Sequence, residues 1–189
     1  MRAERGLSDF DRRHQFSAAF SYDLPFGAGR RWASGAGSLA TALVSGWQVS
    51  GIVTMWSGRP FTTQYSAGDF ATQRPYLVSD PMANIPAGLW FNPNAFARPV
   101  ATAAQPDLYG NAGRNILKGP GYQNVDLAVT RTFTATNDVR LQFRAEAFNL
   151  LNRANYDVPV FLLDASNVGQ ATATQGDARQ LQFALRVLF

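Results

Sequence analysis

RQLQFALRVLF, residues Arg179–Phe189, is the stretch that decides which fold this chain is expected to adopt. Apolar side chains stand at every second position, and mostly polar ones fill the positions between them. Because side chains alternate between the two faces of a strand, the stretch has one apolar face and one mostly polar face. It also ends on an aromatic residue, whereas soluble termini are usually polar and frayed. The pattern predicts the strand that closes an outer-membrane β-barrel, with an apolar face made of Leu181, Phe183, Leu185, Val187 and Phe189.

The composition is typical of an all-β chain with many turns. The 189 residues include 14 Phe, 6 Tyr and 4 Trp, and only 16% are charged. No apolar run approaches the roughly 18 residues that a transmembrane helix needs, but barrel strands carry a much weaker hydrophobic signal. The net charge of +4 is scattered along the chain, so we expect no nucleic-acid partner. Residues 1–13 lack the apolar segment of a secretory signal. We therefore expect Met1 not to be the true beginning of an outer-membrane protein.

The residues that usually carry chemistry are scarce. The chain has no cysteine and a single histidine, His14, which excludes disulfides, thiolate catalysis and a site built from several histidines. No serine, aspartate or glutamate stands in a pattern that pairs a nucleophile with a base. We expect no catalytic residue, no metal site and no cofactor, and the protein is not predicted to be an enzyme.

The alternation of the closing strand recurs in four earlier segments. Strands are predicted at His14–Leu24, Trp47–Ser57, Tyr122–Phe133 and Val139–Leu151. A short helical turn is expected between the first two, with Ser38 as its cap. Gly58 to Gly121 shows no sustained period and predicts irregular structure. The five strands thus alternate short connections with long ones, as outer-membrane barrels alternate short turns and long external loops.

The strand faces place two groups of residues on opposite sides of the predicted wall. Aromatic residues of outward parity lie near the strand ends on the side of the short turns, where an interfacial aromatic girdle is expected: Phe26, Trp47, Phe133 and Phe189. Polar residues of inward parity are predicted to face the lumen: Asp126, Arg140, Arg144, Glu146 and Arg186. A self-paired, hydrated wall is the favoured interpretation of this second group, and contact with a plug or a solute path is the alternative.

The third and fourth strands allow a prediction of register. Alignment of the two apolar faces suggests that Phe133 pairs with Val139 and Val129 with Phe143. In this register Asp126 opposes Glu146, and Arg144 is expected to bridge the two acids.

Arg131 has outward parity, where lipid should lie. Its position near Phe133 predicts that its side chain reaches the headgroups by snorkelling.

Five runs of the chain are similar to a known family. Four of them, GWQVSGIVTMWSGRPFT, YGNAGRNILKGPGYQNVDLAVTRTF, LQFRAEAFNLLNRANY and RQLQFALRVLF, resemble the C-terminal barrel portion of Oar-like TonB-dependent transporters. The opening SDFDRRHQFSAAFSYDLPFG resembles an upstream strand of the same barrels. The resemblance implies a barrel of about twenty-two strands, a plug inside it and solute uptake driven through TonB. Such proteins lie in the outer membrane of Gram-negative type, in contact with its lipid.

About five strands cannot close a barrel, since single-chain barrels have at least about eight. We therefore expect residues 1–189 to be the C-terminal part of a TonB-dependent transporter barrel domain, an antiparallel, incomplete barrel segment with long external loops. The plug, the remaining strands and the TonB contact are expected in an N-terminal part that these residues lack. Two alternatives stay open. One is a barrel assembled from several chains. The other is a soluble, secreted β-sandwich that binds carbohydrate through aromatics such as Trp56, Tyr65 and Trp90.

Overall fold

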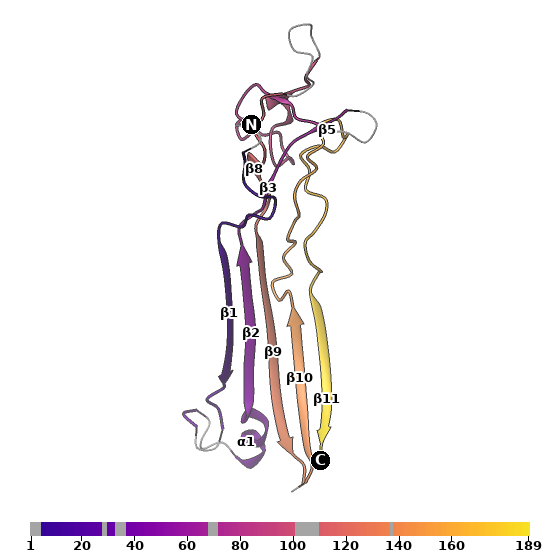
Figure 1. The fold of residues 1–189 in the computed structure, drawn as a ribbon. Coiled ribbons are helices and arrows are strands. Elements are labelled where there is room, and N and C mark those ends of the chain that lie inside the picture. The colour runs from indigo at the N-terminus through magenta and orange to yellow at the C-terminus, as the bar shows by residue number, and fades with distance from the viewer. Residues whose placement is uncertain (1–4, 28–29, 33–36, 68–71, 101–109, 137) are drawn as a thin grey trace. The chain divides into compact units, whose positions relative to one another are not determined.

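The computed structural model describes residues 5–27, 30–32, 37–67, 72–100, 110–136 and 138–189 (Figure 1). These residues form two compact units, which are described one at a time. The first, called the sheet unit, consists of Phe16–Met55, Gln123–Ala154 and Asp177–Phe189. The second, called the loop unit, consists of Met1–Gln15, Trp56–Tyr122 and Asn155–Gly176.

The five predicted strands form one sheet. Its strand order is β1-β2-β9-β10-β11, and the arrows in Figure 1 alternate in direction from each strand to the next. The bounds are Gln15–Asp23 for β1, Trp47–Trp56 for β2, Tyr122–Thr134 for β9, Arg140–Phe148 for β10 and Gln180–Leu188 for β11. The strand that was expected to reach Leu151 ends earlier, because Asn149 takes a left-handed conformation with φ of 48°. An all-β antiparallel architecture is thereby confirmed.

The predicted register between the third and fourth strands is wrong by two residues. Phe133 pairs with Leu141 instead of Val139, and Val129 pairs with Ala145 instead of Phe143. The predicted assignment of residues to the two faces is unaffected. Side chains alternate with a period of two residues, so a shift of two keeps every residue on its side of the sheet. The turn accounts for the difference. The backbone N–H groups of Ala135 and Thr136 both donate to the carbonyl of Val139, so Val139 closes the turn and is not part of the ladder. Residue 137 of the expected turn lies outside the described residues.

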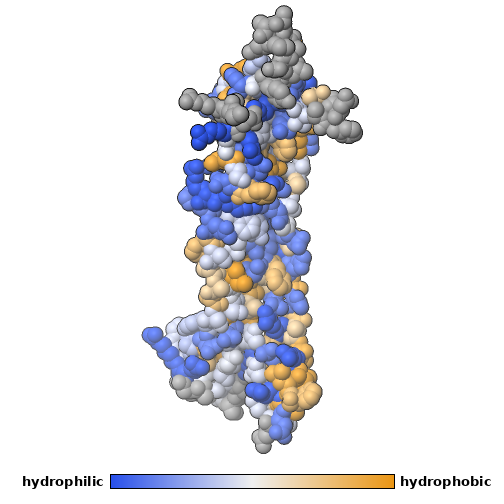
Figure 2. Space-filling view, viewed as in Figure 1, coloured by the Kyte–Doolittle hydropathy of each residue, from blue (hydrophilic) through white to orange (hydrophobic). Residues whose placement is uncertain are grey.

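Two faces of different chemistry result. Along β11, the side chains of Phe183 and Leu185 are 70% and 68% exposed on the apolar face. Hydrophobic residues gather in Figure 2 over the lower end of the sheet, where β11 ends. This observation contradicts the alternative of a β-sandwich, in which the apolar faces would be buried against a second sheet.

A short helix, α1, spans Ser38–Val44 between β1 and β2. Ser38 was expected to cap this helix, and that prediction is wrong: the N-cap is Gly37, and no side-chain hydrogen bond caps the helix. The backbone N–H of Ser45 donates to the carbonyl of Thr41 at the other end. Within the described ranges, no helix has both the length and the apolar character needed to cross a bilayer.

The loop unit has a small hydrophobic core and little regular structure, as the missing periodicity of Gly58–Gly121 predicted. In the part of this unit that the structure describes, three two-stranded ribbons pair β3 (Pro60–Phe61) with β8 (Leu117–Lys118), β4 (Tyr65–Ser66) with β5 (Thr72–Gln73), and β6 (Tyr76–Leu77) with β7 (Phe96–Ala97). A 3-10 helix, η2, spans Pro93–Ala95. The core contains Phe61, Phe91, Phe96 and Leu117, with Phe91 fully buried at 0% exposure.

Candidate functional site

The apolar face of the sheet unit is the first candidate site. β10 and β11 place their apolar residues in register, with Phe143 opposite Leu185, Ala145 opposite Phe183 and Leu141 opposite Val187. Removing a side chain of the size of Val, Leu or Phe from water is worth about 1.5–3 kcal/mol. A continuous face of such residues is therefore stable only against an apolar surrounding. Leu181 and Phe189 extend the same face to the two ends of β11.

Arg131 is the exception on the apolar face, and the structure places it differently from the sequence prediction. Its side chain does not reach outward, because the residue is only 5% exposed. The guanidinium lies over the ring of Phe133 at 4.2 Å and near that of Trp47 at 5.3 Å, and it donates a hydrogen bond to the carbonyl of Leu43 in α1. Trp47 Nε1 donates to the same carbonyl at 3.0 Å. A cation is favoured near the C-terminal end of a helix, so α1 and two aromatic rings shield this charge.

The four residues predicted as an aromatic girdle all lie at one end of the sheet or just beyond it. Trp47 begins β2, Phe133 lies near the end of β9, and Phe189 follows β11. Phe26 follows β1 and packs edge-on against Trp32, with the ring centroids 5.5 Å apart. Trp47 also meets Phe143 in an edge contact at 6.2 Å. A girdle role for these aromatics stays a prediction.

The opposite face carries the predicted polar wall. Gln142 opposes Arg186 and Glu146 opposes Gln182, so the polar residues of β10 and β11 share one side. Arg144 Nη2 lies 2.6 Å from Glu146 Oε1. The expected bridge from Arg144 to both acids is wrong, because Glu146 stands opposite Ala128 and not opposite Asp126. Asp126 instead accepts the backbone N–H of Asn149 at 2.9 Å. Arg140 lies opposite Leu188 on this face.

Asn149 is an important residue that the sequence reading did not single out. It is 8% exposed, and its side-chain amide donates to the carbonyls of Arg153 and Asp177, both at 3.0 Å, while its Oδ1 accepts the N–H of Arg153. The side chain thus ties together the two ends of the connection between β10 and β11. The sequence signal that could have identified it is an asparagine at the end of a strand, because asparagine tolerates the left-handed conformation that a turn can require.

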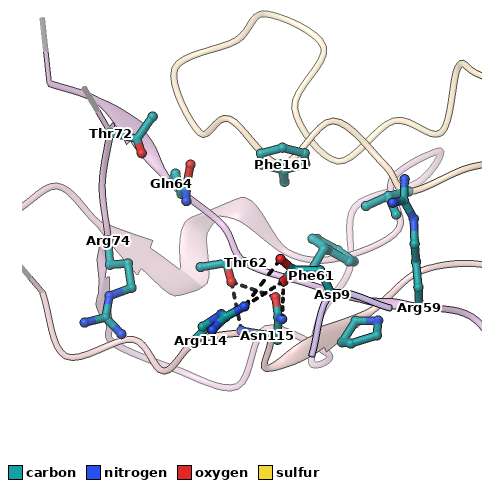
Figure 3. Close-up of a pocket in the computed structure, with 12 residues that line it drawn as sticks. Asp9, Arg59, Phe61, Thr62, Gln64, Thr72, Arg74, Arg114, Asn115 and Phe161 are labelled. Carbon is teal, nitrogen blue, oxygen red and sulfur yellow. Dashed lines mark hydrogen bonds and ion pairs between the residues drawn. The ribbon is translucent and has the colours of Figure 1, made fainter. Parts of the chain in front are cut away.

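The second candidate site is a cavity of about 650 Å³ within the loop unit (Figure 3). Its polar lining includes Arg59, Arg74, Arg114 and Asp9, and Phe161 contributes an apolar wall. In Figure 3, Arg74 and Arg59 lie at opposite sides of the group formed by Arg114 and Asp9. The sequence reading identified none of these residues, because they come from three segments that are far apart in the chain.

Hydrogen bonds hold one wall of the cavity in place. Asn115 is 5% exposed and has φ of 56°; its Nδ2 donates to the Leu7 carbonyl at 2.7 Å, and its Oδ1 accepts from Thr62 Oγ1 at 2.8 Å. Asn115 and Arg114 both donate to Asp9, and these hydrogen bonds hold the pKa of the Asp9 carboxyl below its usual value, so that it stays ionised. Arg59 Nη2 pairs with Asp157 at 2.9 Å.

The side chains that the structure describes include no group of three or more His, Asp or Glu residues placed to hold a metal ion. The aromatics of the carbohydrate-binding alternative are engaged within the loop unit: Trp56 stacks on Tyr122 at 4.1 Å, Tyr65 lies under the guanidinium of Arg98, and Trp90 Nε1 donates to the carbonyl of Lys118. The geometry therefore offers two candidate surfaces, the apolar face of the sheet unit and the cavity of the loop unit.

Comparison with known proteins gives one match. A family model described as "Outer membrane beta barrel domain" matches residues 1–182. No curated protein and no solved structure matches the chain.

Proposed function

The chain belongs to the outer membrane beta barrel domain family, and on that premise we propose that it builds part of the wall of a TonB-dependent transporter. Its location is the outer membrane, where the apolar face of the sheet unit meets lipid. The proposed activity is solute uptake as part of a complete transporter. We assign no chemical reaction to the wall.

The open edges of the sheet support the proposal that these five strands are part of a larger barrel. Among the described residues, β1 and β11 are the outer strands of the sheet, each with one neighbour. Every backbone group that crosses a bilayer needs a hydrogen-bond partner. Further strands must therefore pair with both edges. Within the proposed transporter, these strands and the plug come from the rest of the full-length protein, and TonB acts through that part.

The single observation that carries the wall role is the exposed apolar face. Apolar residues of β10 lie opposite apolar residues of β11, so the face continues from one strand to the next. The polar face behind it fits a hydrated lumen wall around a plug. Arg144 and Glu146 pair with each other there, which supports a structural role for this face over a solute path.

Single-cysteine labelling tests the wall directly, because the chain has no cysteine of its own. We expect Leu185→Cys to resist a membrane-impermeant maleimide even after the outer membrane is permeabilised, because a thiol in hydrocarbon stays protonated and only the thiolate attacks the reagent. Ala184→Cys, one residue away on the opposite face, should react with the same reagent under the same conditions, because its thiol meets water. Equal reaction of both positions with the impermeant reagent would exclude a lipid-facing wall.

Conductance tests the proposed transporter separately from the wall. A barrel that is filled by a plug conducts few ions, so the full-length protein in a planar bilayer should give no steady channel. A large, permanently open conductance would indicate a porin and overturn the transporter assignment, while leaving the wall role intact.

A further inference from the structure

The cavity of the loop unit carries an excess of positive charge. Three arginines, Arg59, Arg74 and Arg114, line it together with a single carboxylate, that of Asp9. Its volume of about 650 Å³ lies inside the range of roughly 300–1,000 Å³ that is usual for small-molecule sites. Asp157, which pairs with Arg59 at 2.9 Å, offsets part of this charge, so three arginines face two carboxylates and one positive charge is in excess.

Two of the arginines have hydrogen-bond capacity left for a ligand. A guanidinium has five N–H donors. The ion pairs of Arg59 with Asp157 and of Arg114 with Asp9 both run through Nη2. Among the described side chains, Nε and Nη1 of Arg59 and Arg114 donate no hydrogen bond. Each ion pair thus anchors its guanidinium and leaves a second edge available to an acceptor.

The wall around Arg114 is rigid before any ligand binds. Asn115 is buried, and its side-chain and backbone hydrogen bonds connect it to Leu7, Asp9 and Thr62. The Asp9 carboxylate accepts hydrogen bonds from both Asn115 and Arg114. Such preorganisation lowers the cost of binding, because fewer side chains lose freedom when the ligand arrives.

An apolar surface completes the cavity. Phe161 is 41% exposed, and Val158 and Pro60 line the cavity with it. Figure 3 places Phe161 on the opposite side of the cavity from Arg114 and Asn115. A ligand that uses both walls must combine an acidic group with an apolar body.

We propose that this cavity binds a small organic anion, whose acidic group is attracted by the arginines of the lining, Arg59 and Arg114 among them, while its apolar part lies against Phe161. This inference concerns the loop unit alone and does not depend on transport. If the cavity does not bind an anion, the labelling and conductance tests keep their meaning. If those tests fail, the anion site can still be tested.

Calorimetric titration of the full-length protein in a non-ionic detergent tests the proposal with three probes. Benzoate has both the charge and the apolar ring, benzamide has nearly the same shape without the charge, and inorganic phosphate has the charge without the ring. We expect benzoate to bind at least about tenfold more tightly than either of the others. Equal affinity for benzoate and benzamide would overturn the anion site, and equal affinity for benzoate and phosphate would overturn the apolar contact.

Variants of opposite sign separate a binding role from a structural one. Arg59→Gln and Arg114→Gln should each weaken benzoate binding about tenfold. Asp9→Asn should tighten it, because it removes the one carboxylate of the lining while its Oδ1 can still accept hydrogen bonds from Arg114 and Asn115. Arg98→Gln is the matched control: Arg98 pairs with Asp164 at 2.5 Å in the same unit but does not line the cavity, so affinity should not change. Weaker binding in Asp9→Asn would overturn the proposal. If Arg114→Gln does not fold, Arg59→Gln and Asp9→Asn decide the result.

Discussion

The sheet unit and the loop unit place the same kind of side chain, phenylalanine, in opposite environments. Phe183 of the sheet unit is 70% exposed, whereas Phe91 of the loop unit is fully buried at 0%. The loop unit is built like a small water-soluble core, closed around three phenylalanines. The sheet unit turns its phenylalanines outward, which is stable only where the surrounding medium is itself apolar. Composition alone therefore does not define the inside of this protein, because each unit is adapted to a different solvent.

The largest effect is expected from Phe91→Ala. Emptying a fully buried Phe site removes its transfer free energy and leaves a cavity, which together cost about 3–5 kcal/mol. Hydrogen exchange of the loop-unit amides, followed as urea is added, measures this loss. Val100→Ala is the control, since Val100 is 71% exposed in the same unit and should change stability by less than about 0.5 kcal/mol. Similar effects of the two variants would mean that the loop unit has no core of its own.

Phe183→Arg should produce the next largest effect. An arginine on the lipid face costs about 2–4 kcal/mol near the bilayer midplane. Gln182→Arg introduces the same side chain one residue earlier, on the polar face, and should be close to neutral. Refolding into lipid vesicles at increasing urea measures both variants. A larger penalty for Gln182→Arg would reverse the assignment of the two faces.

Arg131→Met should have a smaller and local effect. The variant keeps the length of the side chain but loses the hydrogen bond to Leu43 and the stacking over Phe133. We expect the free energy of opening of α1 to fall by about 1.5 kcal/mol, which would appear as faster exchange of the Thr41 and Ser45 amides. Arg131→Lys keeps the charge but loses the planar guanidinium. Its amide exchange rates should lie between those of the unaltered protein and those of Arg131→Met. Unchanged exchange in Arg131→Met would show that α1 does not depend on this contact.

The smallest effect concerns the polar face. Arg144→Ala breaks the pair with Glu146, whose carboxyl-bearing side chain is 17% exposed, whereas Arg140→Ala breaks no ion pair found among the described side chains. We expect Arg144→Ala to destabilise the sheet by about 0.2–1 kcal/mol more than Arg140→Ala. Urea titration in vesicles at low and high salt measures the difference, which should shrink as salt screens the pair. Equal effects of the two variants would show that the pair of Arg144 with Glu146 does not stabilise the sheet.

The sheet was predictable from the sequence because its faces repeat every two residues over long segments. That period locates the strands to within a few residues and assigns each side chain to a face. It does not determine the register, as the slip of two between β9 and β10 illustrates, because a slip of two preserves every face. The register depends on the turn, where Val139 accepts two backbone hydrogen bonds and so lies outside the ladder.

The candidate cavity was not predictable, because its residues come from segments that the sequence does not connect. Asp9 and Asn115 meet only after the loop unit has folded, and neither belongs to a periodic pattern. The shielding of Arg131 was missed for a similar reason. Parity placed it correctly on the apolar face, but only the three-dimensional structure shows that the Leu43 carbonyl and the Phe133 ring receive its charge.

The ribbon of β3 and β8 has a consequence for how quickly the sheet can assemble. Residues 57–121 separate β2 from β9, and closing so long a segment costs about 2 kcal/mol more entropy than closing the short turn before β10. Pro60 and Phe61 pair with Lys118 and Leu117, close to the two ends of that segment. Once this pair has formed, β2 and β9 behave as the arms of a tight hairpin. Because residues 62–116 still have to be closed to form the ribbon, the ribbon carries nearly all of that entropic cost, and pairing β2 with β9 afterwards adds little to it.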